Sequence, residues 1–314
     1  MIVVTGGAGF IGSNLVRGLN REGHEDVVVV DDLTDGRKFA NITECKIHDY
    51  LDKDEFMVLL EKQGAWVKKI RTVFHQGACA VTTEWDGRYM MENNYTYSKR
   101  LLNFCLSRDL QFIYASSAAV YGTGNEFTEN GKNEKPVNVY AYSKYLFDEY
   151  VRERLDNITS QIAGLRYFNV YGPREQHKST MASVVHHFNN QNLKQGKIRL
   201  FKGSGGYENG EQRRDFIYVD DVVNVNLWLM RNTGVTGIFN VGTGSSRSFN
   251  DVARAVISWH GHGDIQYIDF PEKLMESYQS FTEADIGALR KAGYSEEFTD
   301  LDAGVKKYLD WMNR

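Results

Sequence analysis

The chain has 314 residues, of which 42% are hydrophobic and 25% are charged, with a formal net charge of −4 at pH 7. This length allows a large buried core, and the composition is ordinary for a globular protein. The acidic balance argues against general binding to nucleic acids or anionic membranes. No apolar stretch approaches the ~20 residues that span a bilayer, and a signal-peptide pattern is absent. We therefore expect a cytoplasmic protein whose three cysteines are reduced.

The first twelve residues hold a nucleotide-binding pattern. The apolar run 2–5 predicts a buried strand, which breaks directly into Gly6-Gly7-Ala8-Gly9-Phe10-Ile11-Gly12. The glycines allow a tight turn, a close approach of the backbone to phosphate, and close packing of a helix that we predict at 11–22. A pyrophosphate would meet N–H groups and the positive end of the helix dipole there. A second predicted strand, 27–31, ends in Asp31-Asp32, where a carboxylate is expected to meet the adenosine ribose.

The first half of the chain continues to alternate strands and helices, which is typical of parallel strands joined by crossover helices. Tyr142, Leu146 and Tyr150 recur at four-residue spacing and are expected to pack on the sheet. The fold class is therefore α/β, a Rossmann-like doubly wound parallel sheet. Further strands are predicted at 71–76, 111–116 and 161–166, and further helices at 54–63, 88–108 and 140–154.

After about residue 168 the pattern becomes rich in turns. Glycine-rich loops at 203–210 and 242–244 are typical of ligand contacts at the carboxyl ends of strands. We expect a Rossmann domain over residues 1–168 and a smaller, interleaved substrate lobe over 169–314. A segment at about 214–230 is expected to return to the Rossmann domain, because residues 216–219 read as a strand of the main sheet.

Three residues predict proton-transfer chemistry. Tyr140 and Lys144 form the pattern Y-x-x-x-K on a predicted helix, so their side chains share one face. A free tyrosine has a pKa of about 10 and is a poor base at neutral pH. A nearby lysine cation and an oxidised nicotinamide would favour its phenolate, and Lys144 can also bind the nicotinamide ribose. Ser117, at the end of the preceding strand, can hold the same substrate oxygen.

With these elements, the chain resembles the extended short-chain dehydrogenase/reductases, a family of nucleotide-sugar epimerases and dehydratases. The glycine turn, Tyr140 and Lys144 carry the resemblance, together with segments 115–122, 166–173 and 214–222. Finer features resemble the branch that epimerises C6 of an ADP-heptose for the lipopolysaccharide inner core. These features include Trp85-Asp86-Gly87 within 82–94, His177-Lys178-Ser179 within 172–183, and residues 75–79.

The resemblance implies a redox-neutral reaction. A hydride leaves C6 for tightly bound NADP⁺, the transient 6-ketone shifts, and NADPH returns the hydride to the opposite face. Two acid/base groups are then needed, one for each orientation of the C6 oxygen. The resemblance assigns Tyr140 and Lys178 to these roles, with Lys144 and Ser117 as their catalytic partners. It also implies a homo-oligomer.

Other contacts follow from the resemblance residue by residue, and neither the family nor the histidine spacing implies a metal. Cofactor contacts are expected at Gly6, Gly9, Phe10, Ile11, Gly12, Asp31, Asp32, Lys38, Lys53, Gln76, Gly77, Ala78, Cys79, Ala80, Asn93, Lys144, Val170 and Lys178. Substrate contacts with ADP-heptose are expected at Asn169, Ser179, Thr180, His187, Phe201, Lys202, Gly203, Ser204, Arg214 and Tyr278. Arg214 suits a phosphate because its planar guanidinium binds phosphate bidentately.

Two features depart from the expected pattern. The tandem Asp31-Asp32 would repel the 2′-phosphate of NADP and so favours NAD, unless Lys38 and Lys53 supply compensating positive charge. We expect NADP, with NAD as the alternative. The family also commonly carries Glu at position 76 and Ser at 80 and 81, where this chain has Gln76, Ala80 and Val81.

Three other functions remain as alternatives of decreasing strength. A UDP-hexose 4-epimerase uses the same hydride logic but has no evident use for Lys178. A dehydratase commonly needs Asp-Glu after the strand-end serine, where this chain has Ala118-Ala119. A non-catalytic nucleotide sensor would characteristically lack the tyrosine or the lysine, and both are present here.

Overall fold

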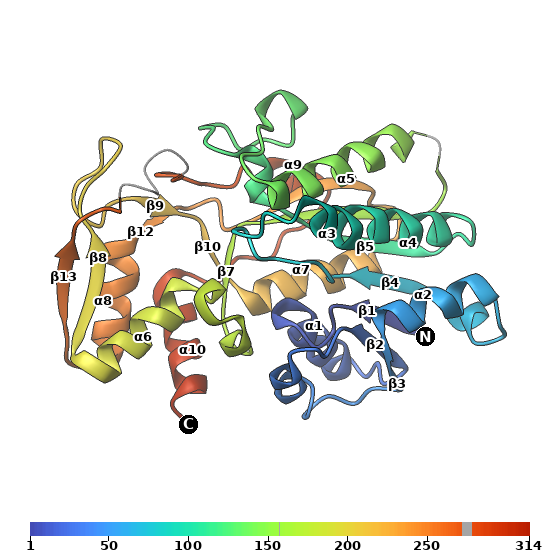
Figure 1. The fold of residues 1–314 in the computed structure, drawn as a ribbon, viewed down its shortest axis with the longest axis horizontal. Coiled ribbons are helices and arrows are strands. Elements are labelled where there is room, and N and C mark those ends of the chain that lie inside the picture. The colour runs from blue at the N-terminus through green and yellow to red at the C-terminus, as the bar shows by residue number, and fades with distance from the viewer. Residues whose placement is uncertain (157, 272–277) are drawn as a thin grey trace. The chain divides into compact units, whose positions relative to one another are not determined.

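The computed structural model describes residues 1–156, 158–271 and 278–314 (Figure 1). The chain forms two compact units, each assembled from separate stretches of sequence. The first unit consists of Met1–Val120, Pro136–Arg166 and Val222–Phe239. The second consists of Tyr121–Lys135, Tyr167–Asp221 and Asn240–Arg314.

The main sheet has seven strands in the order β11-β6-β5-β4-β1-β2-β3. Strand β1 pairs with β2 on one side and with β4 on the other, in parallel. The order reverses between β1 and β4, which is the point where doubly wound folds bind ligands at the carboxyl ends of strands. The predicted fold class is confirmed. The strands are β1 (Ile2–Thr5), β2 (Val27–Asp31), β3 (Asp49–Asp52), β4 (Thr72–His75), β5 (Gln111–Ser117), β6 (Ile162–Tyr167) and β11 (Gly237–Val241).

The four predicted helices agree with the observed ones to within about two residues, with one interruption, whereas α7 was not predicted. The helix predicted at 88–108 is α3, a π-helical turn Glu92–Thr96 and α4 in succession. Such π-helical turns are rare and occur frequently at functional sites. The helices are α1 (Phe10–Arg21), α2 (Lys53–Lys62), α3 (Gly87–Met91), α4 (Tyr97–Leu106), α5 (Val139–Leu155) and α7 (Val219–Arg231).

The strand runs are continuously apolar because both faces of a parallel sheet are covered. Val27–Val30 are fully buried, and Val3, Val28 and Val30 share a core cluster with Phe112. The short strand β3 was not predicted, because only Leu51 of its four residues is buried and the rest are polar or aromatic. An edge strand of this kind leaves almost no hydrophobic pattern to detect.

The predicted packing face of α5 was wrong in part, because Tyr150 packs against the core but Tyr142 does not. Tyr142 is 46% exposed, whereas Ala141, Lys144, Phe147 and Asp148 are buried. The buried face thus includes a lysine and an aspartate, which a search for large apolar residues passes over. Because these charges occupy core positions, the hydrophobic pattern alone points to a neighbouring stripe of the helix.

The second unit contains three two-stranded sheets and a helical cluster. Helices α6 and α8 lie beside strand β8, and Val185, Ile198 and Val256 belong to their shared core (Figure 1). The strands pair as β7 (Asn169–Tyr171) with β10 (Phe216–Tyr218), β8 (Lys197–Phe201) with β13 (Asp264–Ile268), and β9 (Arg213–Arg214) with β12 (Arg247–Ser248). The helices are α6 (Val184–Gln195), α8 (Phe249–His260), α9 (Gly287–Lys291) and α10 (Leu301–Met312).

The expectation that residues 216–219 add a strand to the main sheet was wrong. Phe216–Tyr218 instead pair in parallel with Asn169–Tyr171, in a small sheet of the second unit. The segment that rejoins the first unit is Val222–Phe239, which carries most of α7 and the start of β11. A run of three apolar residues does not show which partner strand it will meet.

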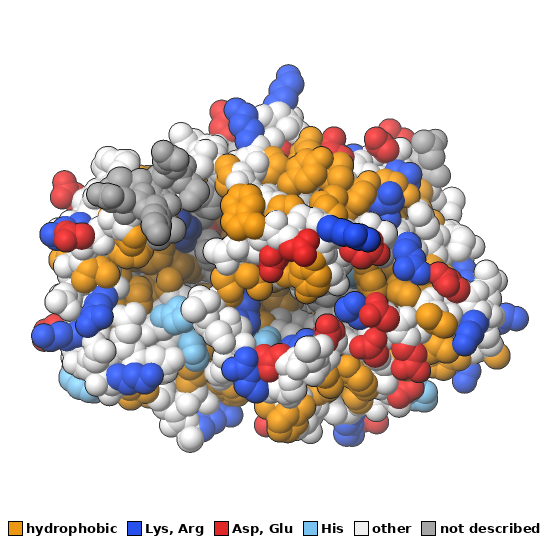
Figure 2. Space-filling model, viewed as in Figure 1, with side chains coloured by type: hydrophobic (Ala, Val, Ile, Leu, Met, Phe, Trp, Pro, Cys, Tyr) orange, Lys and Arg blue, Asp and Glu red, His pale blue; other side chains and the backbone are white. Residues whose placement is uncertain are grey.

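The surface carries charged side chains of both signs. On the face shown in Figure 2, basic and acidic side chains are interspersed, in line with the small net charge. In the described part of the chain, no helix is long and apolar enough to cross a membrane. Cys45, Cys79 and Cys105 are thiols rather than disulfide partners.

A buried ion pair ties α5 to the sheet. Asp148 accepts a hydrogen bond at 2.9 Å from Arg166 Nε, and both side chains are completely buried. The same carboxylate accepts hydrogen bonds from Tyr114 Oη at 2.9 Å and from Ser116 Oγ at 2.8 Å. These three partners of Asp148 all lie on β5 or β6.

We expect Asp148→Ala to destabilise the protein by roughly 3–5 kcal/mol, because it leaves the Arg166 charge buried without its partner. Glu149→Ala is the matched control on the same helix, since its pair with Arg152 is partly exposed and contributes at most about 1 kcal/mol. Urea denaturation of both variants measures the difference. Equal free energies of unfolding for the two would contradict the role given to Asp148.

Candidate active site

The turn between β1 and α1 forms a tight backbone cradle. Gly6 has φ of +65°, in the left-handed region that favours glycine, and its carbonyl accepts a hydrogen bond from Gly9 N at 3.0 Å. A Cβ added to Gly12 would lie 2.1 Å from Gly6 O, so only glycine allows the helix to start this close. Gly9 precedes α1 without a side-chain cap, and the first turn of α1 carries no acidic residue. This N-terminus suits an anion such as pyrophosphate.

The loop that follows β4 lies directly against this cradle. A Cβ on Gly6 would lie 2.6 Å from Gly77 N, so the two backbones touch. Gln76 N donates to Thr5 O at 3.0 Å, and Gly77 N donates to Thr5 Oγ1 at 3.2 Å. Two sets of predicted cofactor residues, Gly6–Gly12 and Gln76–Ala80, are thereby brought together in the first unit.

The acidic pair at the end of β2 is engaged within the chain. Asp31 Oδ2 accepts a hydrogen bond from Ala8 N at 2.8 Å, and Asp31 Oδ1 forms an ion pair with Lys38 Nζ at 2.7 Å. The Asp32 carboxylate accepts a hydrogen bond from Thr34 N at 2.8 Å, and hydrogen bonds from Thr34 lower its pKa. Lys38 therefore neutralises Asp31 directly, while Lys53 lies near enough to lower the pKa of Asp32 slightly.

Tyr140, Ser117 and Lys144 come together as predicted from the Y-x-x-x-K spacing. Tyr140 and Lys144 lie one turn apart on α5, and Tyr140 is hydrogen-bonded to Ser117, the last residue of β5. Lys144 Nζ donates to Ala115 O at 2.8 Å. The Asn138 side chain caps α5 by accepting from Ala141 N at 2.8 Å, which fixes where the helix begins.

The electrostatics of this group differ from the expectation in one respect. Burial raises the pKa of Tyr140 and the bond to Ser117 lowers it, without a contribution from Lys144. The expected effect of Lys144 on the phenol is therefore not seen, because its ammonium bonds to Ala115 O and interacts electrostatically with Asp148. Burial also lowers the pKa of Lys144 to about 8, and Asp148 partly opposes that shift.

Asn94 is a site residue that the sequence reasoning missed. The predicted contact, Asn93, donates its amide to Tyr89 O within its own helix at 2.8 Å. Asn94 is completely buried, and its side chain bonds both the N–H and the C=O of Cys79, at 2.8 and 3.0 Å. It also donates to Ser143 Oγ on α5 at 3.1 Å. Adjacent asparagines look alike in sequence, and only the π-helical turn decides which one faces inward.

In the second unit, Lys178 lies in a 3-10 helix that spans Gln176–Met181. Burial lowers the pKa of Lys178, and Glu175 opposes the shift. The Glu175 carboxylate is itself buried and accepts hydrogen bonds from Ser183 N at 2.5 Å and Ser183 Oγ at 2.6 Å. The desolvated amine that a lysine base or acid requires is therefore present at Lys178.

Three of the predicted substrate residues gather near Lys178. Ser179 has φ of +50°, a left-handed conformation that costs a non-glycine residue of order 1–3 kcal/mol. His187 Nε2 lies 3.3 Å from Thr180 O, so α6 contacts this 3-10 helix. Strained residues of this kind cluster at ligand-binding sites. The left-handed conformation of Ser179 could not be predicted from the residue types around it.

A second group adjoins, through Tyr278, a cavity of about 460 Å³ in the second unit. Arg214 is buried, with its guanidinium 4.9 Å from the centre of the Tyr278 ring and 5.6 Å from that of Phe249. Phe270 links Phe201 to Tyr278 through ring contacts at 5.0 and 4.9 Å. The sequence reasoning missed most residues lining this cavity, which are Thr123, Gly124, Asn125, Gly205, Tyr207, Tyr278, Gln279, Ser280 and Phe281.

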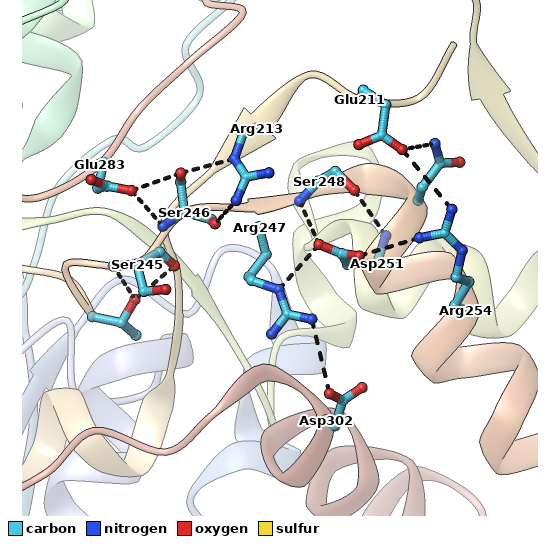
Figure 3. A network of polar contacts seen from close by, with 12 residues as sticks. Glu211, Arg213, Ser245, Ser246, Arg247, Ser248, Asp251, Arg254, Glu283 and Asp302 are labelled. Atoms are coloured by element: carbon cyan, nitrogen blue, oxygen red, sulfur yellow. Dashed lines mark hydrogen bonds and ion pairs between the residues drawn. The ribbon is translucent and has the colours of Figure 1, made fainter. Parts of the chain in front are cut away.

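A polar network holds Arg213, the residue that precedes Arg214 on β9 (Figure 3). Arg213 Nε donates to Ser246 Oγ at 3.1 Å, and Ser246 donates to Glu283 Oε2 through N and Oγ at 2.9 and 2.8 Å. Arg213 and Arg214 are successive residues of β9, so their side chains point to opposite faces of the strand. The network that fixes Arg213 therefore also orients Arg214.

The remaining predicted residues take these positions. Lys53 begins α2 and pairs with Asp54 at 3.0 Å, and Asn169 and Val170 lie in β7. Lys202, Gly203 and Ser204 follow β8, where Gln212 Nε2 donates to Lys202 O and Ser204 Oγ, both at 3.1 Å. Within the described ranges, no three His, Cys, Asp or Glu side chains are grouped to hold a metal ion.

The Rossmann strand order, the glycine cradle and the Tyr140–Ser117–Lys144 group define a nucleotide-dependent oxidoreductase-type site. The chain belongs to the NAD dependent epimerase/dehydratase family, whose model matches residues 2–242.

Individual relatives show which members of this family the chain is similar to. The chain is 57% identical over 310 residues to the ADP-L-glycero-D-manno-heptose-6-epimerase of Alkalilimnicola ehrlichii, covering 99% of this chain and 97% of that one. The solved ADP-L-glycero-D-manno-heptose-6-epimerase of Helicobacter pylori superposes with a TM-score of 0.85 at 33% identity, over 99% and 96% of the two chains. A UDP-glucose 4-epimerase from Thermus thermophilus, solved with NAD, gives 0.80 at 26% identity, over 99% and 98%.

Proposed function

We propose that this chain inverts C6 of the heptose in ADP-D-glycero-D-manno-heptose to give ADP-L-glycero-D-manno-heptose. The observation that carries the proposal is 57% identity, across nearly the whole chain, to an enzyme of that name. Two groups whose pKa values are shifted by desolvation support it, Tyr140 in the first unit and Lys178 in the second. UDP-hexose 4-epimerisation is the alternative, because a solved relative at 26% identity carries that name.

The residues present fit a nicotinamide dinucleotide. Gly6, Gly9 and Gly12 allow the tight turn that leads into the uncapped start of α1, because an added Cβ at Gly6 or Gly12 would clash with neighbouring backbone, and a pyrophosphate suits this N-terminus. The loop Gln76–Ala80 and Lys144 would hold the part nearer the sugar. When bound, the cofactor supplies reversible hydride transfer.

The protein side of the reaction is proton transfer at the C6 oxygen. Tyr140 exchanges a proton with that oxygen, while Ser117 holds it by a hydrogen bond. Burial raises the pKa of Tyr140, so the phenol is protonated in the chain alone and requires a nearby cation to act as a base. The hydrogen bond from Lys144 Nζ to Ala115 O holds the N-terminal part of α5 against β5.

Inversion requires a proton partner for each of two orientations of the C6 oxygen. Lys178 is our candidate for the second partner, because burial lowers its pKa towards the range in which an amine exchanges protons at neutral pH. Glu175 opposes this lowering of the Lys178 pKa. Arg214, beside the cavity lined by Tyr207 and Tyr278, would bind the diphosphate of the ADP group.

The substrate assignment is tested by incubating the holoenzyme with ADP-D-glycero-D-manno-heptose and, separately, with UDP-galactose. We expect inversion at C6 of the heptose and no turnover of UDP-galactose. Deuterium placed at C6 should remain in the product, because a hydride held by the cofactor does not exchange with water. Turnover of UDP-galactose alone, or deuterium loss to solvent, would reject the proposal.

Tyr140→Phe and Lys178→Met should each lower kcat by about 10²–10⁴-fold, because each removes a group that transfers a proton in the transition state. Tyr142→Phe, exposed on the same helix, and Lys194→Met, exposed on α6, are the matched controls. Initial rates with ADP-heptose measure the effect. A Lys178→Met variant as active as the Lys194→Met control would remove Lys178 from the mechanism.

We further propose that NADP is the natural cofactor, because Lys38 neutralises Asp31 and so weakens the repulsion of a 2′-phosphate. Lys38→Gln should weaken NADPH binding by about tenfold or more, equivalent to ~1.4 kcal/mol, and change NADH binding much less. Lys46→Gln, which removes an exposed pair with Glu25, is the control. Fluorescence titration with both cofactors gives the dissociation constants. A parent protein that prefers NADH would refute the assignment.

A further inference from the structure

A buried chain of hydrogen bonds runs from the loop after β4 to the π-helical turn. Thr5 Oγ1 lies 2.7 Å from His75 Nδ1, and His75 Nε2 lies 2.7 Å from Ser98 Oγ. Ser98 Oγ donates to Asn94 O at 2.6 Å, and Gly77 N donates to Thr5 Oγ1 at 3.2 Å. Thr5, His75, Ser98 and Asn94 are all at most 2% exposed.

The donors in this chain point in one direction. Ser98 gives its proton to Asn94 O, so its oxygen must accept from His75 Nε2–H. His75 Nδ1 is then the unprotonated nitrogen and accepts the proton of Thr5 Oγ1, whose oxygen accepts Gly77 N–H. Of the two neutral tautomers, only the one with its proton on Nε2 satisfies all four bonds, and burial disfavours the imidazolium.

The surroundings of His75 maintain this neutral tautomer. The imidazole is stacked between Tyr97 and Phe112, with ring centres 5.9 and 5.8 Å away. Burial, with a smaller contribution from the Lys144 cation, lowers the pKa of His75 to about 3.

Both ends of the chain reach groups already assigned to the reaction. At one end, Gly77 belongs to the loop that touches Gly6 in the glycine cradle. At the other end, Asn94 bonds the backbone of Cys79 and Ser143 Oγ, and Ser143 Oγ donates to Tyr140 O at 2.7 Å. One hydrogen-bonded path therefore joins the cradle, the Gln76–Ala80 loop and the first turn of α5.

We infer that His75 is a positioning residue for the reaction: through Thr5 and Ser98 it fixes the Gln76–Ala80 loop relative to Tyr140. This inference rests on the proposed function for its kinetic consequence, and on the first unit alone for its geometry. His75 touches neither substrate nor cofactor in this scheme. Since misplacement of reacting groups by about 1 Å can cost 10²-fold in rate, a loosened loop should lower kcat more than it raises KM.

The test removes the Thr5 hydroxyl. Thr5→Val keeps the shape of the side chain but leaves Gly77 N–H and His75 Nδ1 without their shared partner, whereas Thr5→Ser keeps the hydroxyl. For Thr5→Val we expect kcat to fall by roughly 10–100-fold, KM for ADP-heptose to change by less than about threefold, and the NADPH dissociation constant to rise by about tenfold. Thr5→Ser should restore all three to within about threefold of the parent.

Val3→Ala is the stability control, because Val3 is fully buried on the same strand and its side chain carries no hydrogen-bonding group. It should lower the melting temperature while leaving kcat and the NADPH dissociation constant near those of the parent. His75→Gln, which can donate to Ser98 but cannot accept from Thr5 at the Nδ1 position, should resemble Thr5→Val.

Three results would overturn the inference. These are parent-like kcat and NADPH affinity in Thr5→Val, losses in Val3→Ala that match those in Thr5→Val, or a Thr5→Ser variant as defective as Thr5→Val. If the parent does not turn over ADP-heptose, the proposed function fails. The NADPH affinities of the same variants then still decide whether His75 positions the loop.

Discussion

The parallel register of β1, β4 and β5 places Thr5, His75 and Tyr114 in one row across the sheet. The next row holds Gly6, Gln76 and Ala115. Gly6 begins the glycine cradle, Gln76 begins the loop after β4, and Ala115 O accepts the hydrogen bond from Lys144. A shift of one residue in either pairing would turn the side chains of that strand to the opposite face of the sheet. The buried hydrogen bonds of His75 to Thr5 and Ser98 link β4 to β1 and to α4 in this register.

Burial of charge is the second constraint, and it recurs in both units. In the first unit, Lys144 and the Asp148–Arg166 pair occupy the inner face of α5 and its contact with the sheet. In the second unit, Lys178 is desolvated beside Glu175. Each amine is thus kept in a weakly solvated place with a carboxylate near it. This arrangement adjusts proton affinity, whereas apolar residues at the same positions would add only packing.

Much of the first unit could be predicted because its signals are local. The valine run 27–30 and the glycines 6–12 identify strand and turn from neighbouring residues alone, and Tyr140 and Lys144 share a helical face by spacing. Prediction was wrong where a choice depended on distant partners. Tyr142 lies outside because Lys144 and Asp148 find bonding partners in the sheet, and Phe216–Tyr218 pair with β7 rather than with the main sheet.

The sequence by itself determined the α/β class, the glycine turn after β1 and the shared helical face of Tyr140 and Lys144, because each depends on residues close together in the chain. Only the tertiary structure decided that Asn94 rather than Asn93 bonds the loop after β4, that Lys38 neutralises Asp31, and that His75 is held as one neutral tautomer. Those features depend on which buried donors meet which acceptors across the fold, and hydrogen bonds between segments far apart in sequence leave no periodic trace in it.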